Sequence, residues 1–223
     1  MSYSRFAIYY VPPAGPLADF GASWLGWDVV RGREAAQLPM PELYDITMTP
    51  RNYGLHGTLK PPFRLKDNRT MATLEQATAD LAASLAPAVC DPLDLTTLGG
   101  FLALTPRGET SALQRVAAAC VRDLDGFRAP ASAAELARRR AVGLSVCQDA
   151  LLVQWGYPYV MEEFKFHLTL SGRLLKEDVD HWSQTVRRVL PDLSAPFVVD
   201  QIALCAERDD GRFELIQRYT LAG

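Results

Sequence analysis

Two short stretches decide the fold of this chain: His56-Gly57-Thr58-Leu59 in its first third and His167-Leu168-Thr169-Leu170 in its last third. Each stretch leads the same succession of a helix, a strand and a second strand. That second strand begins at Phe101 after the first motif and at Phe213 after the second, at nearly the same distance along the chain. The sequence therefore predicts a duplicated strand–helix–strand–strand unit.

The spacing within each motif predicts where its polar side chains point. A β-strand directs every second side chain to the same face, so His56 and Thr58 share one face. His167 and Thr169 share a face for the same reason. If the two units pack about a pseudo-twofold axis, both pairs line one cleft.

Two imidazoles and two hydroxyls around one cleft suit the cleavage of a phosphodiester. Imidazole titrates near pH 6.5, so one ring can accept a proton while the other donates one. The threonine hydroxyls can donate hydrogen bonds to the phosphate oxygens as negative charge builds. Neither step needs a metal or a cofactor, and we expect none. Which histidine is the acid and which the base stays undecided, because the two copies are alike.

A single His-x-Thr pattern arises by chance, and one strand histidine is more often structural than catalytic. Two of the three histidines of this chain, however, occupy matching motifs. The third, His181, precedes Trp182 on a predicted helix and has no such partner. We therefore interpret His56, Thr58, His167 and Thr169 as the catalytic residues.

Hydrophobic periodicity outlines the remaining elements. We expect strands over residues 4–11, 53–60, 93–98, 101–104, 164–170, 197–204 and 213–219. We expect helices over 16–30, 71–85, 113–124, 132–140, 144–155 and 179–190, with Cys147 and Leu151 inward in the fifth. The Pro-rich segment 31–51 is predicted to be an irregular surface excursion.

Composition narrows the class of protein. The 223 residues are 48% hydrophobic and 22% charged, as in a folded globular domain. No apolar run approaches the length of a membrane span, and the start lacks a signal-peptide pattern. Four cysteines without CxxC spacing favour reduced core thiols in a cytoplasmic protein. A net charge of −3 disfavours extended nucleic acid as a partner. The sequence does not predict an oligomeric state.

Further candidates for substrate binding lie near the motifs. Lys60 follows Thr58 by two positions and is predicted to share its strand face, within reach of a phosphate. Arg51 and Tyr53 lead into the first motif, and Tyr157 precedes the second, where an aromatic ring could stack on a base or sugar. Of the run 138–140, Arg139 or Arg140 is favoured as an anion contact, because three consecutive helical positions cannot face one way.

The chain resembles a known superfamily, the two-histidine phosphoesterases, whose mark is a pair of H-x-[ST]-h motifs, one in each half. More narrowly, it resembles proteins encoded beside bacterial phosphonate-utilisation genes. The matching stretches are RFAIYYVP, PRNYGLHGTLKPPF, GGFLAL, FRAP, ARRR, WGYPYV and FKFHLTLSG, in that order. Gly57 departs from the pattern, which has alanine more often.

This resemblance implies an α+β fold with two antiparallel sheets flanking a central cleft. We expect one two-lobed domain over 1–223, with motif lobes around 51–105 and 160–220. The implied activity is metal-independent hydrolysis of a small cyclic phosphate or phosphodiester. Two alternatives stay open: an RNA-end 2′,3′-cyclic phosphodiesterase or 2′–5′ ligase-like enzyme, and a non-catalytic module that binds a phosphorylated metabolite.

Overall fold

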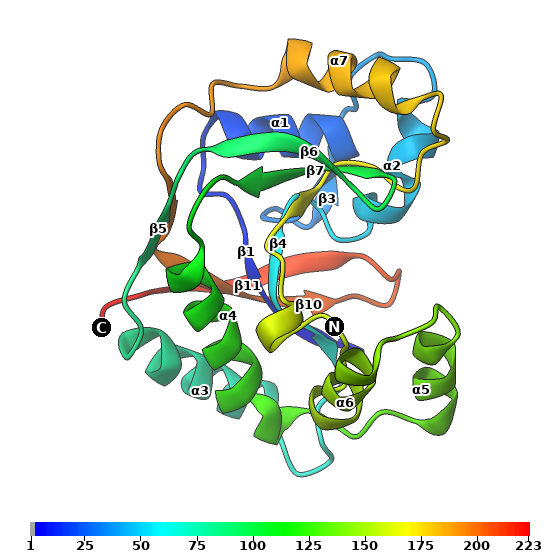
Figure 1. Cartoon of the computed structure of the whole chain (residues 1–223). Coiled ribbons are helices and arrows are strands. Elements are labelled where there is room, and N and C mark those ends of the chain that lie inside the picture. The colour runs from blue at the N-terminus through cyan, green and yellow to red at the C-terminus, as the bar shows by residue number, and fades with distance from the viewer. Residues whose placement is uncertain (1–2) are drawn as a thin grey trace.

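The computed structural model describes residues 3–223, and its centre is a seven-stranded sheet (Figure 1). Every neighbouring pair of strands in this sheet is antiparallel. The strand order is β11 (Phe213–Thr220), β10 (Gln201–Glu207), β1 (Phe6–Tyr10), β4 (Gly57–Phe63), β8 (Leu168–Thr169), β7 (Phe101–Pro106) and β6 (Leu93–Leu98). The predicted α+β class with antiparallel strands is confirmed.

The sheet has two halves that meet between the two motif strands. β4 lies with β1, β10 and β11, whereas β8 lies with β6 and β7. One residue pair, Gly57 and Leu168, joins the halves. The stretches 51–105 and 160–220 therefore each contribute strands to both halves. That the chain forms a single two-lobed domain stays a prediction, and residues 1 and 2 lie outside the described residues.

Two smaller ribbons complete the strands. β2 (Trp27–Asp28) pairs with β3 (Arg33–Glu34), and β5 (Ala88–Cys90) pairs with β9 (Phe197–Val199). In the second ribbon, β5 comes immediately before β6 in the chain and β9 comes immediately before β10. The ribbon therefore lies where the chain enters each half of the large sheet.

Seven α-helices surround the described sheet (Figure 1). In the view of Figure 1, α7 (Val179–Val189) and α1 (Pro16–Leu25) lie at the top near the β6–β7 hairpin, while α3 (Met71–Ala83) and α4 (Ser111–Asp123) lie at the bottom. The others are α2 (Leu43–Arg51), α5 (Ala133–Arg140) and α6 (Val146–Trp155), and two 3-10 turns are η1 (Asp125–Phe127) and η2 (Met161–Glu163).

Helix starts follow local signals in the sequence. The hydroxyls of Thr70, Ser132 and Ser145 accept hydrogen bonds from the third backbone N–H of α3, α5 and α6, respectively. These bonds satisfy N–H groups that have no partner within the helix. α1 instead begins with Pro16, whose fixed φ suits a first helical position.

Strand β1 is buried on both faces and divides the core. Phe6, Ile8 and Tyr10 point into the main hydrophobic cluster, which α3, α4 and α7 cover. Ala7 and Tyr9 point the other way, into a smaller cluster with Phe213 of β11. Side chains alternate along a strand, so Tyr9 lies on this second face of the sheet. The motif side chains His56 and Thr58 lie on the same face.

The structure corrects several expectations. Segment 31–51 is not irregular throughout, because it holds β3 and α2. Of the strand expected over 164–170, only residues 168 and 169 pair in the sheet. The strand expected over 197–204 is divided into β9 and β10. Cys147 is exposed rather than inward and its Sγ–H donates to Glu162, whereas Leu151 is buried as expected.

All four cysteines are free thiols, and no helix within residues 3–223 is long and apolar enough to cross a lipid bilayer.

Candidate active site

The two motifs lie side by side on adjacent strands. Gly57 pairs with Leu168 in the antiparallel register. Continuing that register by one residue on each side sets His56 opposite Thr169 and Thr58 opposite His167. Gly57 and Leu168 are buried on the core side, so the four polar side chains share the other face. The topology thus brings both motifs together, as the spacing predicted.

Gly57 is required by a close approach between the strand and an aromatic ring. A Cβ atom at this position would lie 2.3 Å from two ring carbons of Phe166. Phe166 is itself buried and packs against Tyr10 and Phe197. The departure of Gly57 from alanine is therefore matched to Phe166 and leaves the cleft face unchanged.

His56 is held by hydrogen bonds on both ring nitrogens. Its Nδ1–H donates to the carbonyl oxygen of Gly54 at 2.9 Å. Its Nε2 lies 3.2 Å from the hydroxyl oxygen of Thr58. An imidazole whose Nδ1 carries the proton has an acceptor lone pair on Nε2, so the Thr58 hydroxyl donates to it.

His56 also lies beneath an aromatic ring. The centroid of the Tyr9 ring is 3.9 Å from that of His56, with 32° between the planes. Burial lowers the pKa of His56 to about 4, and His167 adds to the lowering, whereas the bond to Gly54 opposes it. His56 is therefore a neutral imidazole at neutral pH.

His167 is half-buried, as His56 is, but its ring makes fewer contacts. Its Nδ1–H donates to the carbonyl oxygen of Lys165 at 2.7 Å. The Phe101 ring lies 5.7 Å from it, centroid to centroid, at 55°. Within residues 3–223 its Nε2 has no hydrogen-bond partner, so that nitrogen is free for a ligand.

Two adjoining cavities lie over the motif face. The His56 cavity, of about 450 Å³, is lined by His56, Thr58 and Thr169 among others. The His167 cavity, of about 400 Å³, is lined by His167 and again by Thr58. Phe101 and Tyr157 also line both. The two cavities therefore adjoin at these shared residues and together form the hollow over the motif face, with one imidazole in each part.

Three of the residues predicted to bind substrate line this hollow. Tyr53, Arg139 and Tyr157 all contribute to the His56 cavity. The Arg139 guanidinium lies 4.7 Å from the centroid of the Tyr157 ring. Within the described residues Arg139 makes no ion pair, which leaves its charge available to an anion. Arg140 is different, because it pairs with Asp149 on the exposed side of α5 and lines neither cavity.

The expectation that Lys60 faces the cleft is wrong. On β1, the neighbours Ile8 and Tyr9 are opposite Lys60 and Thr58, so β4 has one extra residue there. Such a bulge breaks the alternation of side chains. Lys60 is consequently 1% exposed on the core side, where its ammonium donates to the Val121 carbonyl at 2.9 Å. Burial lowers its pKa to about 8.

Arg51 is likewise structural. Its side chain is buried, and its Nε–H donates to the Leu25 carbonyl at 2.8 Å. Its Nη2 donates to Gln37, Thr47 and the carbonyl of Tyr44. Arg51 therefore fastens α2 to the end of α1 and does not line the hollow.

The structure adds residues that sequence reasoning missed. Tyr9, Arg5, Phe101, Ser171 and Arg173 line the His56 cavity. Tyr9 gave no signal, because its run of β-formers looks like any buried strand. Arg173 could have been noticed, since it follows the second motif by a few residues. Arg5 is neutralised by Glu207, to which its Nε donates at 2.6 Å.

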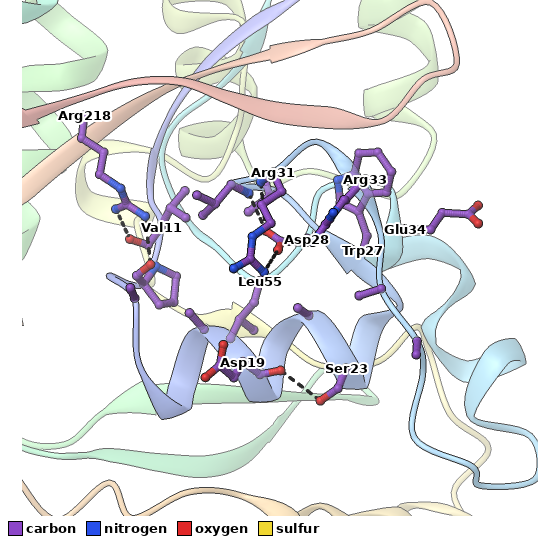
Figure 2. Close-up of a pocket in the computed structure, with 18 residues that line it drawn as sticks. Val11, Asp19, Ser23, Trp27, Asp28, Arg31, Arg33, Glu34, Leu55 and Arg218 are labelled. Atoms are coloured by element: carbon purple, nitrogen blue, oxygen red, sulfur yellow. Dashed lines mark hydrogen bonds and ion pairs between the residues drawn. The ribbon is translucent and has the colours of Figure 1, made fainter.

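A third cavity, of about 500 Å³, lies away from the motif side chains, between α1 and the β2–β3 ribbon (Figure 2). Leu55, one residue before His56, points into it. Several of its charges are engaged: Arg31 pairs with Asp28, and Arg218 donates to the carbonyls of Val11 and Pro12. It contains neither motif histidine, so it is not the candidate active site.

Residues 3–223 hold no group of three or more histidine, cysteine or carboxylate side chains arranged to bind a metal ion.

Comparison with known proteins gives a family. Residues 58–214 match the family described as "Protein of unknown function (DUF1045)". The match begins at the threonine of the first motif and ends within β11. The chain belongs to this family.

A curated relative from Janthinobacterium sp. (strain Marseille), named "Ribose 1,5-bisphosphate phosphokinase PhnN", is 34% identical over 94% of this chain and 49% of its own. The chain spans about half the length of the curated relatives that it matches.

Solved structures with a similar fold include one titled "Crystal structure of phosphoesterase", with 14% identity, a TM-score of 0.47 and all of both chains covered. Another is E. coli LigT complexed with NADP+, with 14% identity, a TM-score of 0.48 and the same coverage.

Proposed function

We propose that this chain is a phosphoesterase that hydrolyses a small cyclic phosphate or phosphodiester by acid–base catalysis with His56 and His167. The observation that carries the proposal is the pairing of Gly57 with Leu168, which puts both His/Thr pairs on one face. Thr58 lines the cavities of both histidines. A phosphorus atom held over Thr58 has one imidazole on each side.

The reaction needs one proton removed and one delivered. One imidazole takes a proton from the attacking water while the other gives a proton to the leaving oxygen. The hydroxyls of Thr58 and Thr169 donate hydrogen bonds to the non-bridging oxygens, where charge develops. Because imidazoles carry both protons, we propose that the reaction proceeds without a metal ion.

The remaining lining residues support a small phosphorylated substrate. Arg139 supplies a cation without an ion-pair partner among the described residues. Tyr53 and Tyr157 supply aromatic faces on which a sugar or a base can pack. We propose substrate contacts for these three residues and none for Arg51, Lys60 or Arg140.

The relatives suggest which substrates to test first. In the Janthinobacterium protein the matched region is about half of a chain named for ribose 1,5-bisphosphate. Hydrolysis of a ribose-based cyclic phosphate would give a ribose phosphate. This is the class of compound that the name of the relative contains. The resemblance to proteins encoded beside phosphonate-utilisation genes agrees with this choice.

The test is hydrolysis of ribose cyclic phosphates, 2′,3′-cyclic nucleotides and 2′–5′ dinucleotides in the presence of a chelator, followed by ³¹P NMR. We expect turnover that the chelator leaves unchanged. His56→Ala and His167→Ala should each lower kcat/KM by about 10³-fold or more. His181→Ala is the matched control, because this exposed histidine lies on α7 and lines neither cavity.

Two results would contradict the proposal: turnover that persists in the His56→Ala, His167→Ala double variant, or binding without turnover across the whole panel. The second result would instead favour a module that binds a phosphorylated metabolite. A preference for RNA ends would appear as a steep loss of binding with added salt, since a polynucleotide releases more counterions than a mononucleotide.

A further inference from the structure

We propose that Tyr9 is a positioning residue that reserves His56 for the base role, so that His167 delivers the proton to the leaving group. This inference rests on the proposed function and deepens it, because the duplicated motifs alone do not distinguish the two histidines. It depends on the contact between Tyr9 and His56, on the charges that face each imidazole, and on the hydrogen bonds of each ring.

Tyr9 covers His56 from the neighbouring strand. It is opposite Thr58 in the register of β1 and β4, and it is 0% exposed. Its ring takes the place that water would otherwise occupy against the imidazole, at 3.9 Å between centroids. An imidazolium is hydrated more strongly than an imidazole, so this cover favours the neutral ring.

The hydroxyl of Tyr9 does not compensate for the lost water. It is buried and has no hydrogen-bond partner within the described residues. Burial also raises the pKa of Tyr9 well above its ordinary value, so the group stays an uncharged phenol. No phenolate therefore stands beside His56 to stabilise a protonated ring.

The charges around the His56 cavity act in the same direction. Its titratable lining groups besides His56 and Tyr9 are Arg5, Tyr53, Arg139, Tyr157 and Arg173, and it includes no carboxylate. Of the three guanidiniums, Arg5 is neutralised by Glu207. A protonated His56 would therefore face cations, with His167 across the strand pair.

The surroundings of His167 are different. Its cavity is lined by the carboxylate of Glu163 and the ammonium of Lys165. Glu163 accepts a hydrogen bond from Gln148 at 2.9 Å, and its side chain lines the same cavity as His167. The described part of the chain thus offers a carboxylate to an imidazolium at position 167 but none to one at 56.

These differences give each ring one part of a balanced step. When substrate binds, the Thr58 hydroxyl exchanges its hydrogen bond to His56 Nε2 for one to a phosphate oxygen. The freed Nε2 lone pair takes a proton from water, and the water oxygen forms a bond to phosphorus. The bond from phosphorus to the leaving oxygen breaks, and the imidazolium of His167 gives that oxygen its proton. At the end His56 is charged and His167 neutral, and exchange of one proton each with solvent restores both rings.

The first experiment follows the two imidazoles by ¹H–¹⁵N NMR across a pH titration of the free protein. In wild type we expect the His56 midpoint to lie well below the ordinary value of an imidazole, and we expect its neutral-state proton on Nδ1. Tyr9→Phe keeps the ring and should leave the His56 midpoint unchanged. Tyr9→Leu removes the ring, admits water and should raise that midpoint by about one pH unit or more.

A second experiment compares substrates that differ only in the leaving group. An alkoxide needs a proton from the acid, whereas p-nitrophenolate leaves without one. We expect His167→Ala to lose about 10³-fold in kcat/KM with the alkoxide ester but less than about tenfold with the p-nitrophenyl ester. His56→Ala should lose about 10³-fold with both.

The outcomes separate this inference from the proposed function. If the His56 midpoint lies at or above the ordinary value of an imidazole, or if p-nitrophenolate rescues His56→Ala and not His167→Ala, the assignment is overturned. The wild-type titration needs no variant and no substrate, so it decides the matter even if Tyr9→Leu fails to fold. If the titrations agree but no substrate of the panel is turned over, the proposed function fails instead.

Discussion

The two copies of the motif share a four-residue pattern but stand in different surroundings. The first is part of β4, a seven-residue strand between β1 and β8. Of the second motif, only Leu168 and Thr169 form a strand, the two-residue β8. The Tyr9 ring lies 3.9 Å from that of His56, whereas the ring nearest to His167, that of Phe101, lies 5.7 Å away. Duplication supplies matching chemical groups, and the neighbouring strands then make those groups unequal.

The largest expected effect concerns His56. Its pKa is lowered from 6.5 in the unfolded chain to about 4 in the folded one, because of burial. Between these values the unfolded state binds more protons, so folding stability falls as the pH drops from about 6.5 to about 4. The loss should reach at most about 3 kcal/mol.

Urea denaturation of wild type at pH 7 and pH 4.5 measures this loss. His56→Gln should remove most of the difference between the two pH values, whereas His181→Gln should retain it. An equal acid sensitivity in wild type and His56→Gln would mean that the two motif surroundings do not differ as described.

The next effect compares the two threonines. Thr58 lies 3.2 Å from His56 Nε2 and lines both cavities, whereas Thr169 lines only the His56 cavity. Thr58→Val and Thr169→Val should each lower kcat by about 10²-fold, the cost of one lost donor to a developing anion. Thr58→Val should be the more damaging. Serine at either position, which keeps the hydroxyl, should restore most of the rate, and a failure to do so would contradict the donor role.

A third effect tests the pairing of β4 with β8 on the side that faces the hydrophobic core. Gly57→Ala places a Cβ 2.3 Å from the ring of Phe166 and should cost about 2 kcal/mol of stability. Gly126→Ala is the control, since a Cβ there has nothing within 4 Å. Phe166→Leu added to Gly57→Ala should recover part of the loss in denaturant unfolding. A Gly57→Ala variant as stable as wild type would show that the strand approach is looser than described.

The smallest effect concerns the bulge that only the first motif strand has. Lys60→Met keeps the volume of a buried side chain that donates to the Val121 carbonyl. We expect stability to fall by about 1.5 kcal/mol, because the Val121 carbonyl and Asp125 lose their donor, and kcat/KM to change by less than twofold. A tenfold rise in KM would instead place Lys60 at the phosphate, as strand alternation alone had predicted.

The sequence predicts the motif side of this comparison. It does not predict several other features, and each of these has a physical reason. His56, Thr58, His167 and Thr169 share one face because alternation within a motif is local. Alternation predicts Lys60 on the cleft face, but one extra residue in β4 reverses the faces to which the following side chains point. No residue type in the sequence indicates that bulge.

Arg51 and Arg140 were misjudged for another reason. Both look like free cations in the sequence, yet one is bound by carbonyls of two helices and the other by Asp149. Leu25 belongs to α1 and Asp149 to α6, and the packing that brings these neighbouring helices against the two arginines is visible only in three dimensions. The sequence does not predict α2, because Pro50 lies near the end of this helix and proline usually interrupts helices.

The single residue pair between β4 and β8 has a consequence for the relative position of the two motifs. Each His/Thr pair belongs to its own half of the sheet, and the halves pair at Gly57 and Leu168. A change in the backbone at either of these residues would therefore shift one His/Thr pair relative to the other without replacing any of the four side chains.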